Sequence, residues 1–360
     1  MLIYIIYFVL IAVMAVEYEF QPFENKIPLV IISLMLILLA GFRSPEVARD
    51  YDSYQLNFEL IRNLDDPIFL TILEPGFIAI VYIIQLVSAE NYAMLIMLFF
   101  ALASVTIKIK AIDQLALNPY LVILFYFAHF FILHEMTQIR IGLASGIFLI
   151  SLPYYLKGNR PAFTGMILIA CLFHYSAIFY LGILFFDTRT VNRYIYSAAL
   201  GLTLILAIVR LPLTSLLSKF DSASVSVKLE NYVELGQRGL LEDINVFNSM
   251  TILNFLCCTY LLFFIPASTL LADKKLVLFL KCNILSIFLL SLLSGVPSVA
   301  FRFSELFGVV SMFLFAYLVR FLPFYKLNLV IVVLLAGLLF YIVGFYGGGL
   351  LNEYKIVHIK

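Results

Sequence analysis

The chain has 360 residues, of which 64% are hydrophobic and 12% are charged, and its formal net charge at pH 7 is +1. This composition excludes a soluble domain, because about half of the residues of a globular protein are polar or charged. The near-zero net charge also excludes the basic surface that nucleic-acid binding requires, so we predict no nucleic-acid partner.

Apolar runs recur along the chain, and many are about 17–22 residues long, enough to cross about 30 Å of hydrocarbon as a helix. The sequence therefore predicts an all-α fold, a polytopic transmembrane helical bundle of about 11–13 segments. The first run lacks a basic n-region and a small-residue cleavage site, so we interpret it as a retained helix rather than a signal peptide. The expected spans are 2–16, 27–42, 70–88, 91–108, 119–133, 137–156, 162–186, 194–212, 247–271, 275–295, 300–322 and 326–346.

Two long polar segments, 43–67 and 215–245, interrupt these spans. We predict a single integral membrane domain over 1–360, with extracytoplasmic loops at these two places. The short loops are net basic, which the positive-inside rule assigns to the cytoplasm. Segment 43–67 is placed outside by its length. Two predicted spans then lead to Lys108 and Lys110, so these lysines would also lie outside, which conflicts with the positive-inside rule. The basic loops are 157–160, 189–193, 273–275 and 320–326.

The sidedness of the loops has consequences for three ionisable residues. If the acidic segment 215–245 lies outside, Arg140 and Arg302 fall near the outer ends of their helices. Basic loops flank 162–186 on both sides, which a single crossing cannot satisfy. We therefore predict that this segment is broken near His174 into re-entrant half-helices, which are allowed where the backbone is buried in protein or lines a cavity.

The start of the first polar segment, GFRSPEVARDYDSY, carries Arg43, Tyr51, Asp52 and Tyr54. Carboxylates beside aromatic rings suit sugar recognition, and Asp52 is a candidate general base toward a hydroxyl. The alternative is a solvated loop in which Asp52 caps the next helix. In the LEPGF motif, Glu74 is a candidate substrate contact, or else a cap ahead of a helix that begins at proline.

Arg140, in QIRIGLASG, is the most costly residue of the sequence, because a charge at a transmembrane helix centre costs at least about 2.5–3.5 kcal/mol. Gly142 and Gly146 form a small-xxx-small pair that lets a second helix approach closely. A guanidinium at such a crossing is suited to bidentate phosphate binding, and Gln138 is a candidate substrate contact beside it. The alternative is structural: Arg140 snorkels to the interface or pairs with Glu135.

Three further residues stand out in apolar surroundings. His174, in CLFHYSAI, is a candidate catalytic residue, and the alternative is a hydrogen-bonded helix contact. Arg302, in AFRFSELFGVV, is a second candidate anion-binding arginine. Glu305, at position i+3 from Arg302, is either a substrate contact or its partner in an intrahelical ion pair.

Several common motifs are absent from the sequence, including a P-loop, a Gly-rich dinucleotide fingerprint and HExxH. The four cysteines lie in apolar segments without metal-ligand spacing, so we predict no metal and no cofactor. Because no soluble domain is large enough to hold a nucleotide-sugar, a substrate must arrive through the membrane or from outside it.

The order of the motifs GFR, YDSY, LEPGF, QIRIGLA, LFHYSAI and a late FRF helix, over about residues 40–320, resembles the EpsG/Wzy-like polysaccharide polymerase family. Where that family often has a glycine–aspartate pair, this chain has the residues RDYD at 49–52. The resemblance implies a multi-pass protein of the bacterial cytoplasmic membrane. It also implies a glycosyltransferase-type enzyme that joins polyprenyl-diphosphate-linked oligosaccharide repeat units into a surface polysaccharide at the outer face.

The resemblance also assigns roles to residues. Arg140 and Arg302 would bind the diphosphate leaving group, with Arg43 as a third candidate, because electrostatic stabilisation is the largest catalytic effect expected there. Asp52, or else His174, would deprotonate the acceptor hydroxyl. The implied partners are the lipid-linked oligosaccharide, the bilayer, and a chain-length regulator and flippase of the same pathway.

Two other functions remain open at the level of sequence. A flippase or transporter of lipid-linked oligosaccharide would also need arginines for the diphosphate, although inverted repeats, common in transporters, are not visible here. A membrane O-acyltransferase acting on the glycan would need an activated histidine or carboxylate, for which His174 is the candidate.

Overall fold

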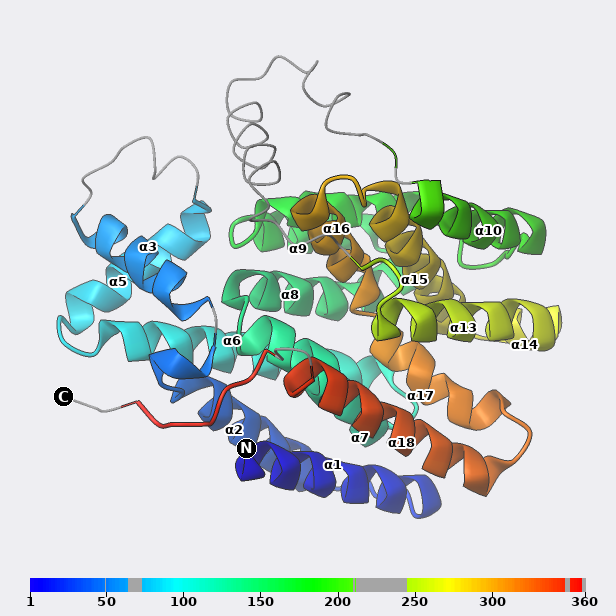
Figure 1. Cartoon of the computed structure of the whole chain (residues 1–360), viewed down its shortest axis with the longest axis horizontal. Coiled ribbons are helices and arrows are strands. Elements are labelled where there is room, and N and C mark those ends of the chain that lie inside the picture. Colours follow the sequence, from blue (N-terminus) through cyan, green and yellow to red (C-terminus); the bar gives the residue numbers. More distant parts are fainter. Residues whose placement is uncertain (49, 64–72, 210, 212–244, 347–349, 358–360) are drawn as a thin grey trace. The chain divides into compact units, whose positions relative to one another are not determined.

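The computed structural model describes residues 1–48, 50–63, 73–209, 211, 245–346 and 350–357. The regular elements among these residues are helices, apart from one isolated antiparallel β-bridge between Arg43 and Ile356 (Figure 1). The predicted all-α fold is therefore confirmed. The helices are α1 (Leu2–Phe20), α2 (Ile27–Gly41), η1 (Pro45–Val47), α3 (Tyr51–Asn63), α5 (Pro75–Val87), α6 (Tyr92–Leu115), α7 (Pro119–Phe125), η2 (Tyr126–Glu135), α8 (Ile139–Leu156), α9 (Arg160–Cys171), η3 (Tyr175–Phe185), α10 (Arg193–Val209), α13 (Ser249–Phe264), α14 (Ala267–Ala272), α15 (Lys274–Leu292), α16 (Pro297–Gly308), α17 (Ser311–Phe321) and α18 (Tyr325–Gly344).

Five helices of the described residues are long and apolar enough to cross a membrane: α1, α6, α8, α15 and the 327–344 part of α18. The pair α16 and α17 makes a sixth span if the two are counted as one, with a bend of 49° between them. The other predicted spans coincide with shorter apolar helices, namely α2, α5, α7 with η2, α9, η3, α10 and α13. The predicted multi-pass helical organisation is thus confirmed.

The chain forms two compact units. The first contains residues 1–184 and 315–360, and the second contains residues 185–314. The single membrane domain over 1–360 stays a prediction.

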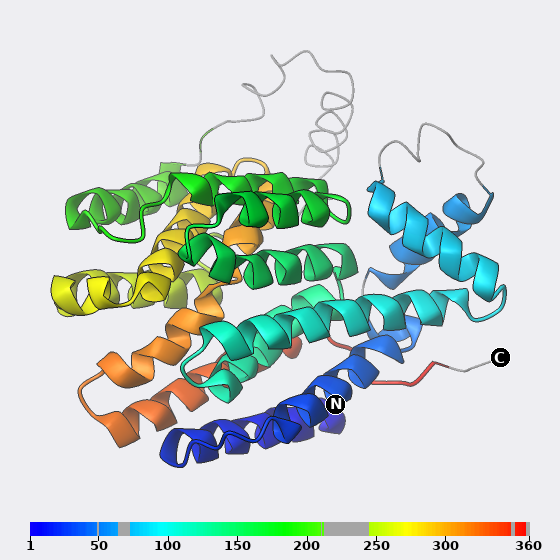
Figure 2. The same cartoon turned by 180° about the vertical axis from the view of Figure 1, so that it is seen from behind.

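In the first unit, α6 is the central helix and packs against α2, α5, α8 and η2 (Figure 2). The crossing of α6 with α8 is close at Gly146, where an added Cβ would lie 3.4 Å from Lys108 Cγ and 3.5 Å from the Ser104 carbonyl oxygen. Such a site leaves room for a methyl group at most. The predicted close approach at the small-xxx-small pair is confirmed.

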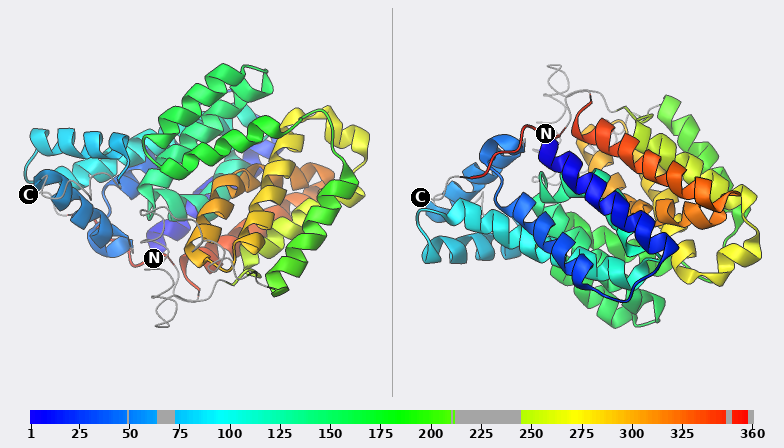
Figure 3. Two further views of the ribbon diagram at one scale, coloured as in Figure 1. Left: turned by 90° about the horizontal axis from the view of Figure 1, so that it is seen from above. Right: turned by 90° about the horizontal axis from the view of Figure 1, so that it is seen from below.

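Helix α7 continues directly into the π-helix η2, which ends one turn before α8 begins. Backbone bonds of the i→i−5 type persist through this turn, from Met136 N to Phe131 O at 3.1 Å and from Gln138 N to Leu133 O at 2.9 Å. A π-turn is rare and is frequently found at functional sites. Helix α18 packs against η2 and also lies beside α1 (Figure 3).

The predicted break near His174 is present. Helix α9 ends at Cys171 and the 3₁₀ helix η3 starts at Tyr175, so Leu172, Phe173 and His174 form a short turn between them. The re-entrant course of the two halves stays a prediction.

The first polar segment is more ordered than a loop, because it contains η1 and the amphipathic helix α3. The C-terminal residues lie against its start: Ser44 N donates to Lys355 O at 2.8 Å and Val357 N donates to Phe42 O at 2.9 Å. Residues 64–67 of this segment, and 215–244 of the second predicted extracytoplasmic loop, lie outside the described residues.

In the second unit, α15 packs against α10, α13, α14 and α16. Lys281 of α15 donates to the Asp187 carbonyl oxygen, and its ammonium lies 5.3 Å from the centre of the Tyr196 ring. Three of the four cysteines are buried in this unit, and Cys171 in the first unit is half-buried, so all four behave as small hydrophobic residues.

Candidate functional site

Three segments of the first unit, distant in sequence, bring Arg140, Glu74 and His174 together. Arg140 Nη1 lies 2.5 Å from Glu74 Oε2, in a hydrogen-bonded ion pair. The other carboxylate oxygen, Glu74 Oε1, lies 3.4 Å from His174 Nδ1. The carboxylate therefore joins the two candidate catalytic residues, and we call Arg140, Glu74 and His174 the triad.

The local sequence explains the position of Glu74. Pro75 occupies the first turn of α5, where its missing N–H costs nothing, and Glu74 at the N-cap is extended with ψ of 134°. Its side chain makes no capping hydrogen bond and is free to turn toward the triad. The predicted cap position is confirmed, but the carboxylate serves as a partner of Arg140 rather than as a cap.

Gly76 explains how the turn that carries His174 can lie so close to the start of α5. Its N–H donates to the Leu172 carbonyl oxygen at 2.8 Å. A Cβ at this position would lie 2.7 Å from the same oxygen, so only glycine fits without a shift of the backbone. The LEPGF motif thus supplies both the carboxylate and the contact that brings His174 to it.

Arg140 is held between aromatic rings. Its guanidinium carbon lies 5.2 Å from the centre of the Phe77 ring and 5.9 Å from that of Tyr54. The Arg140 side chain is 25% exposed, whereas that of Glu74 is 6% exposed, so the guanidinium is the accessible end of the pair. Because a guanidinium has five N–H donors, Arg140 keeps donors for an anionic ligand beyond the one directed at Glu74.

His174 is oriented on one side only. Both ring nitrogens are buried without a hydrogen-bond partner among the described residues, and Nδ1 differs from Nε2 in its 3.4 Å contact with Glu74 Oε1. The next residue reinforces the arrangement, because Tyr175 N donates to Glu74 Oε1 at 3.4 Å and the Tyr175 hydroxyl donates to Leu73 O at 2.9 Å. A histidine with a carboxylate at Nδ1 and a vacant Nε2 has the arrangement of a general base.

The structure also places four other predicted residues of the first unit. Tyr54 contacts Arg140, whereas Asp52 lies in the first turn of α3 with an exposed side chain and does not cap the helix. Gln138 is the N-cap residue of α8, half-buried and two residues before Arg140. Tyr51 is buried near Arg43.

Arg43 is buried, and among the described residues no carboxylate pairs with it. It donates to the Ala40 carbonyl oxygen, and its Nη2 lies 3.3 Å from Met97 Sδ. Burial lowers the pKa of Arg43 to about 10, which still leaves it cationic at neutral pH. The C-terminal residues that pair with 42–44 cover this arginine, so it is less accessible than Arg140.

Arg302 and Glu305 belong to the second unit, on α16. Arg302 is exposed and Glu305 is buried. The intrahelical pair between Arg302 and Glu305, like their role as substrate contacts, stays a prediction.

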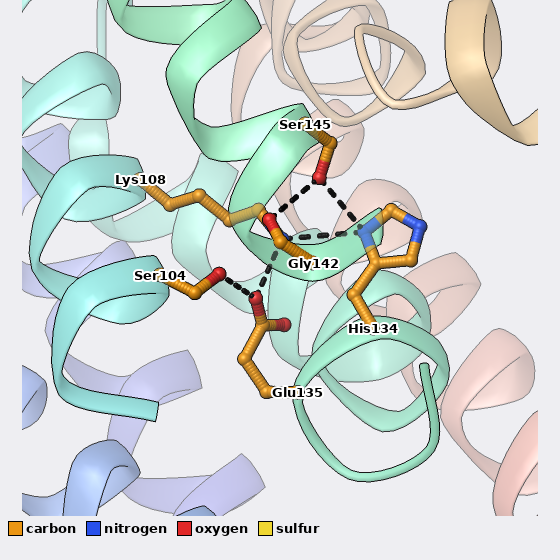
Figure 4. A network of polar contacts seen from close by, with 6 residues as sticks. All are labelled: Ser104, Lys108, His134, Glu135, Gly142 and Ser145. Atoms are coloured by element: carbon orange, nitrogen blue, oxygen red, sulfur yellow. Dashed lines mark hydrogen bonds and ion pairs between the residues drawn. The ribbon is translucent and has the colours of Figure 1, made fainter. Parts of the chain in front are cut away.

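A buried polar network around Lys108 was missed by the sequence interpretation, which placed Lys108 at the end of a span (Figure 4). Lys108 lies within α6, and its Nζ is 2.5 Å from Glu135 Oε1 and 3.2 Å from His134 Nδ1. Ser104 also donates to Glu135 Oε1, at 2.6 Å. The alternative pairing of Arg140 with Glu135 is therefore wrong, because Glu135 pairs with Lys108 and Arg140 with Glu74. Two opposite charges in separate apolar runs, each too costly to stand alone, were the available signal.

Within the described ranges, no group of three or more histidine, cysteine, aspartate or glutamate side chains is placed to hold a metal ion. The chemistry of the triad is that of anion binding and proton transfer.

Comparison with known proteins gives one match. The model of a family described as the EpsG family matches residues 26–356. No curated protein and no solved structure matches the chain.

Proposed function

The chain belongs to the EpsG family, and from this premise we propose that it joins lipid-linked oligosaccharide repeat units with the triad as its catalytic site. Membership of the family implies a polysaccharide polymerase-type function in a multi-pass membrane protein. The observation that carries the proposal is the carboxylate of Glu74, which links an accessible arginine to a histidine with a vacant ring nitrogen.

The donor in this proposal is a glycan attached through its anomeric carbon to a polyprenyl diphosphate. Transfer breaks the bond between that carbon and the diphosphate oxygen, which leaves with the electron pair. Negative charge therefore grows on the diphosphate, and Arg140 is placed to stabilise it with the N–H groups that Glu74 does not use. We also propose Arg302, an exposed arginine of the second unit, as a diphosphate-binding residue.

The acceptor is a hydroxyl of the next repeat unit. Its oxygen forms the new bond to the anomeric carbon, and its proton passes to Nε2 of His174. The Glu74 carboxylate at Nδ1 stabilises the imidazolium that results. The position of His174 supports it as the base more than the exposed Asp52 does, and we propose that Asp52 and Tyr54 contact the sugar instead.

The proposed location follows from the substrate. A lipid-linked repeat unit reaches the triad from within the bilayer, and we propose that transfer takes place at the outer face of the bacterial cytoplasmic membrane. A flippase that delivers the units and a regulator of chain length are the partners expected in such a pathway.

The test uses the purified full chain, reconstituted in vesicles with lipid-linked repeat units. The wild-type protein is expected to form polymer, whereas Arg140→Ala and Arg302→Ala leave single units on the lipid carrier. Arg160→Ala is the matched control, because Arg160 also opens a helix but is exposed and outside the triad. Long polymer from both alanine variants would refute the assignment of these arginines. Movement of lipid-linked units across the bilayer without polymer formation would favour a flippase.

The base is tested separately. His174→Gln keeps a hydrogen-bonding side chain but cannot accept the proton, and a loss of at least 100-fold in rate is expected, at the lower end of general acid–base contributions. Asp52→Asn is expected to change the rate by less. The reverse order of the two losses would make Asp52 the base.

A further inference from the structure

We propose that one stripe of α6, formed by Phe100, Ser104 and Lys108, sets the position of the triad, with Lys108 as a positioning residue for Arg140. The proposal rests on the proposed function of the triad. The three residues are spaced by four, so they project from one face of the helix. All three are buried, at 2% exposure or less.

The first contact of the stripe is aromatic and reaches two segments of the triad. The Phe100 ring centre lies 5.7 Å from that of Phe77, which is three residues after Glu74. It also lies 6.3 Å from that of Phe173, which directly precedes His174. One side chain of α6 thus supports both the glutamate and the histidine.

The second contact is polar and reaches the segment that carries Arg140. Lys108 and Ser104 both donate to the same oxygen of Glu135, which is the last residue of η2 (Figure 4). A carboxylate oxygen bound by two donors from one helix is fixed in direction as well as in distance. Since Glu135 lies five residues before Arg140, these bonds determine where α8 begins.

The turn between Glu135 and Arg140 transmits this constraint because it has little freedom. Thr137 Oγ1 donates to Ile132 O at 3.0 Å, and Gln138 N donates to Leu133 O. A Cβ on Gly142 would lie 3.2 Å from the His134 carbonyl oxygen and 3.4 Å from Glu135 Oε1, so the first turn of α8 packs directly on the end of η2.

The charge on Lys108 has a second effect. Without Lys108, the buried carboxylate of Glu135 would be attracted to another cation, and Arg140 is the nearest cation along the chain. With Lys108 in place, Glu135 is neutralised and Arg140 keeps Glu74 as its partner. Lys108 therefore helps to keep the guanidinium bonded to Glu74 and available to the proposed substrate.

The test is a double-mutant cycle with the reconstituted full chain. Lys108→Met is expected to lower the rate of polymer formation at least tenfold. In an Arg140→Lys background, which retains a charge and measurable activity, the same substitution is expected to lower it less than threefold, because Lys108 acts through Arg140. Lys110→Met, on the same helix but exposed, is the matched control and is expected to retain activity. Equal losses in both backgrounds would overturn the proposal.

A second variant distinguishes a loss of positioning from misfolding. Lys108→Met combined with Glu135→Gln leaves no unpaired charge buried, and the purified protein is expected to remain monodisperse in detergent while losing at least tenfold in rate. Full activity of this folded variant would also overturn the proposal. If Arg140→Ala itself is fully active, the proposed function fails. If Arg140→Ala is inactive while Lys108→Met is not, the inference about α6 alone fails.

Discussion

Gly76→Ala is the substitution that most directly tests the geometry of the triad. The added methyl group would lie 2.7 Å from the Leu172 carbonyl oxygen and 3.0 Å from Leu172 Cβ. The first of these atoms belongs to the backbone, so rotation of a side chain cannot relieve the contact. The turn that carries His174 has to move away from α5.

The size of the movement follows from the contact distance. Ordinary contacts begin near 3.4 Å, so the turn must shift by about 0.7 Å to restore normal van der Waals separation. The shift strains the Gly76–Leu172 hydrogen bond, which contributes about 0.5–1.5 kcal/mol, and overpacking costs about 1–3 kcal/mol. His174 would move from 3.4 Å to about 4 Å from Glu74. Because a misplacement of about 1 Å can cost 100-fold in rate, we expect a loss of about 10- to 100-fold.

The assay is polymer formation in vesicles, paired with thermal unfolding followed by circular dichroism, since the chain has no tryptophan for fluorescence. The control is Gly165→Ala, in the helix α9 that directly precedes the turn, where an added methyl group meets open space. That variant should be neutral or more stable by about 0.4–1 kcal/mol. A wild-type rate for Gly76→Ala, or an equal loss for Gly165→Ala, would show that the contact between α5 and the turn does not position His174.

Three further predictions concern other contacts. Arg140→Lys, which keeps the charge but not the forked donors, should lower the rate of polymer formation by about 10²–10³; an unchanged KM for the lipid-linked unit would place the loss in the transition state. Gly146→Leu should lower the thermal unfolding temperature, because α8 cannot then lie against α6; a Gly146→Ala variant with normal stability is the check on side-chain size. The Lys355 ammonium lowers the pKa of Glu46, so this exposed pair contributes above the ordinary carboxyl value of about 4.3 and fades as pH falls through the lowered value. The protection of the amides of residues 42–44 against exchange, relative to their intrinsic rates at each pH, should fall in acid in the wild-type chain and be low at all pH values in Lys355→Glu.

The fold was predictable because membrane spans are encoded locally. Each predicted span coincides with one or two helices, since the apolar length of a segment alone decides whether it can cross a bilayer. The break at His174 was found by a different route, from the charges of the loops on both sides. The helix α3 was missed, because its amphipathic pattern lies inside a segment taken as polar loop.

The members of the site were predictable, but their pairing was not. Arg140, Glu74, His174 and Tyr54 each stood out as a polar or aromatic residue in a short motif, and the structure brings all four together. The sequence offered Glu135 as the partner of Arg140, because it lies near in the chain. The actual partner is 66 residues away, and only the three-dimensional structure, in which the start of α5 meets the first turn of α8 and the turn at His174, reveals it.

The ion-pair partners of the two buried carboxylates, Glu74 and Glu135, depend on each other. Glu135 and Arg140 lie five residues apart at the junction of η2 and α8, and each needs a partner of opposite charge because neither is well solvated there. If they paired together, Lys108 and Glu74 would be left as unpaired buried charges, which is far more costly than the present arrangement. The pairs Lys108–Glu135 and Arg140–Glu74 are therefore a joint solution, and a change at any one of the four redistributes the others. This coupling predicts that Lys108 matters for a reaction whose substrate it does not touch.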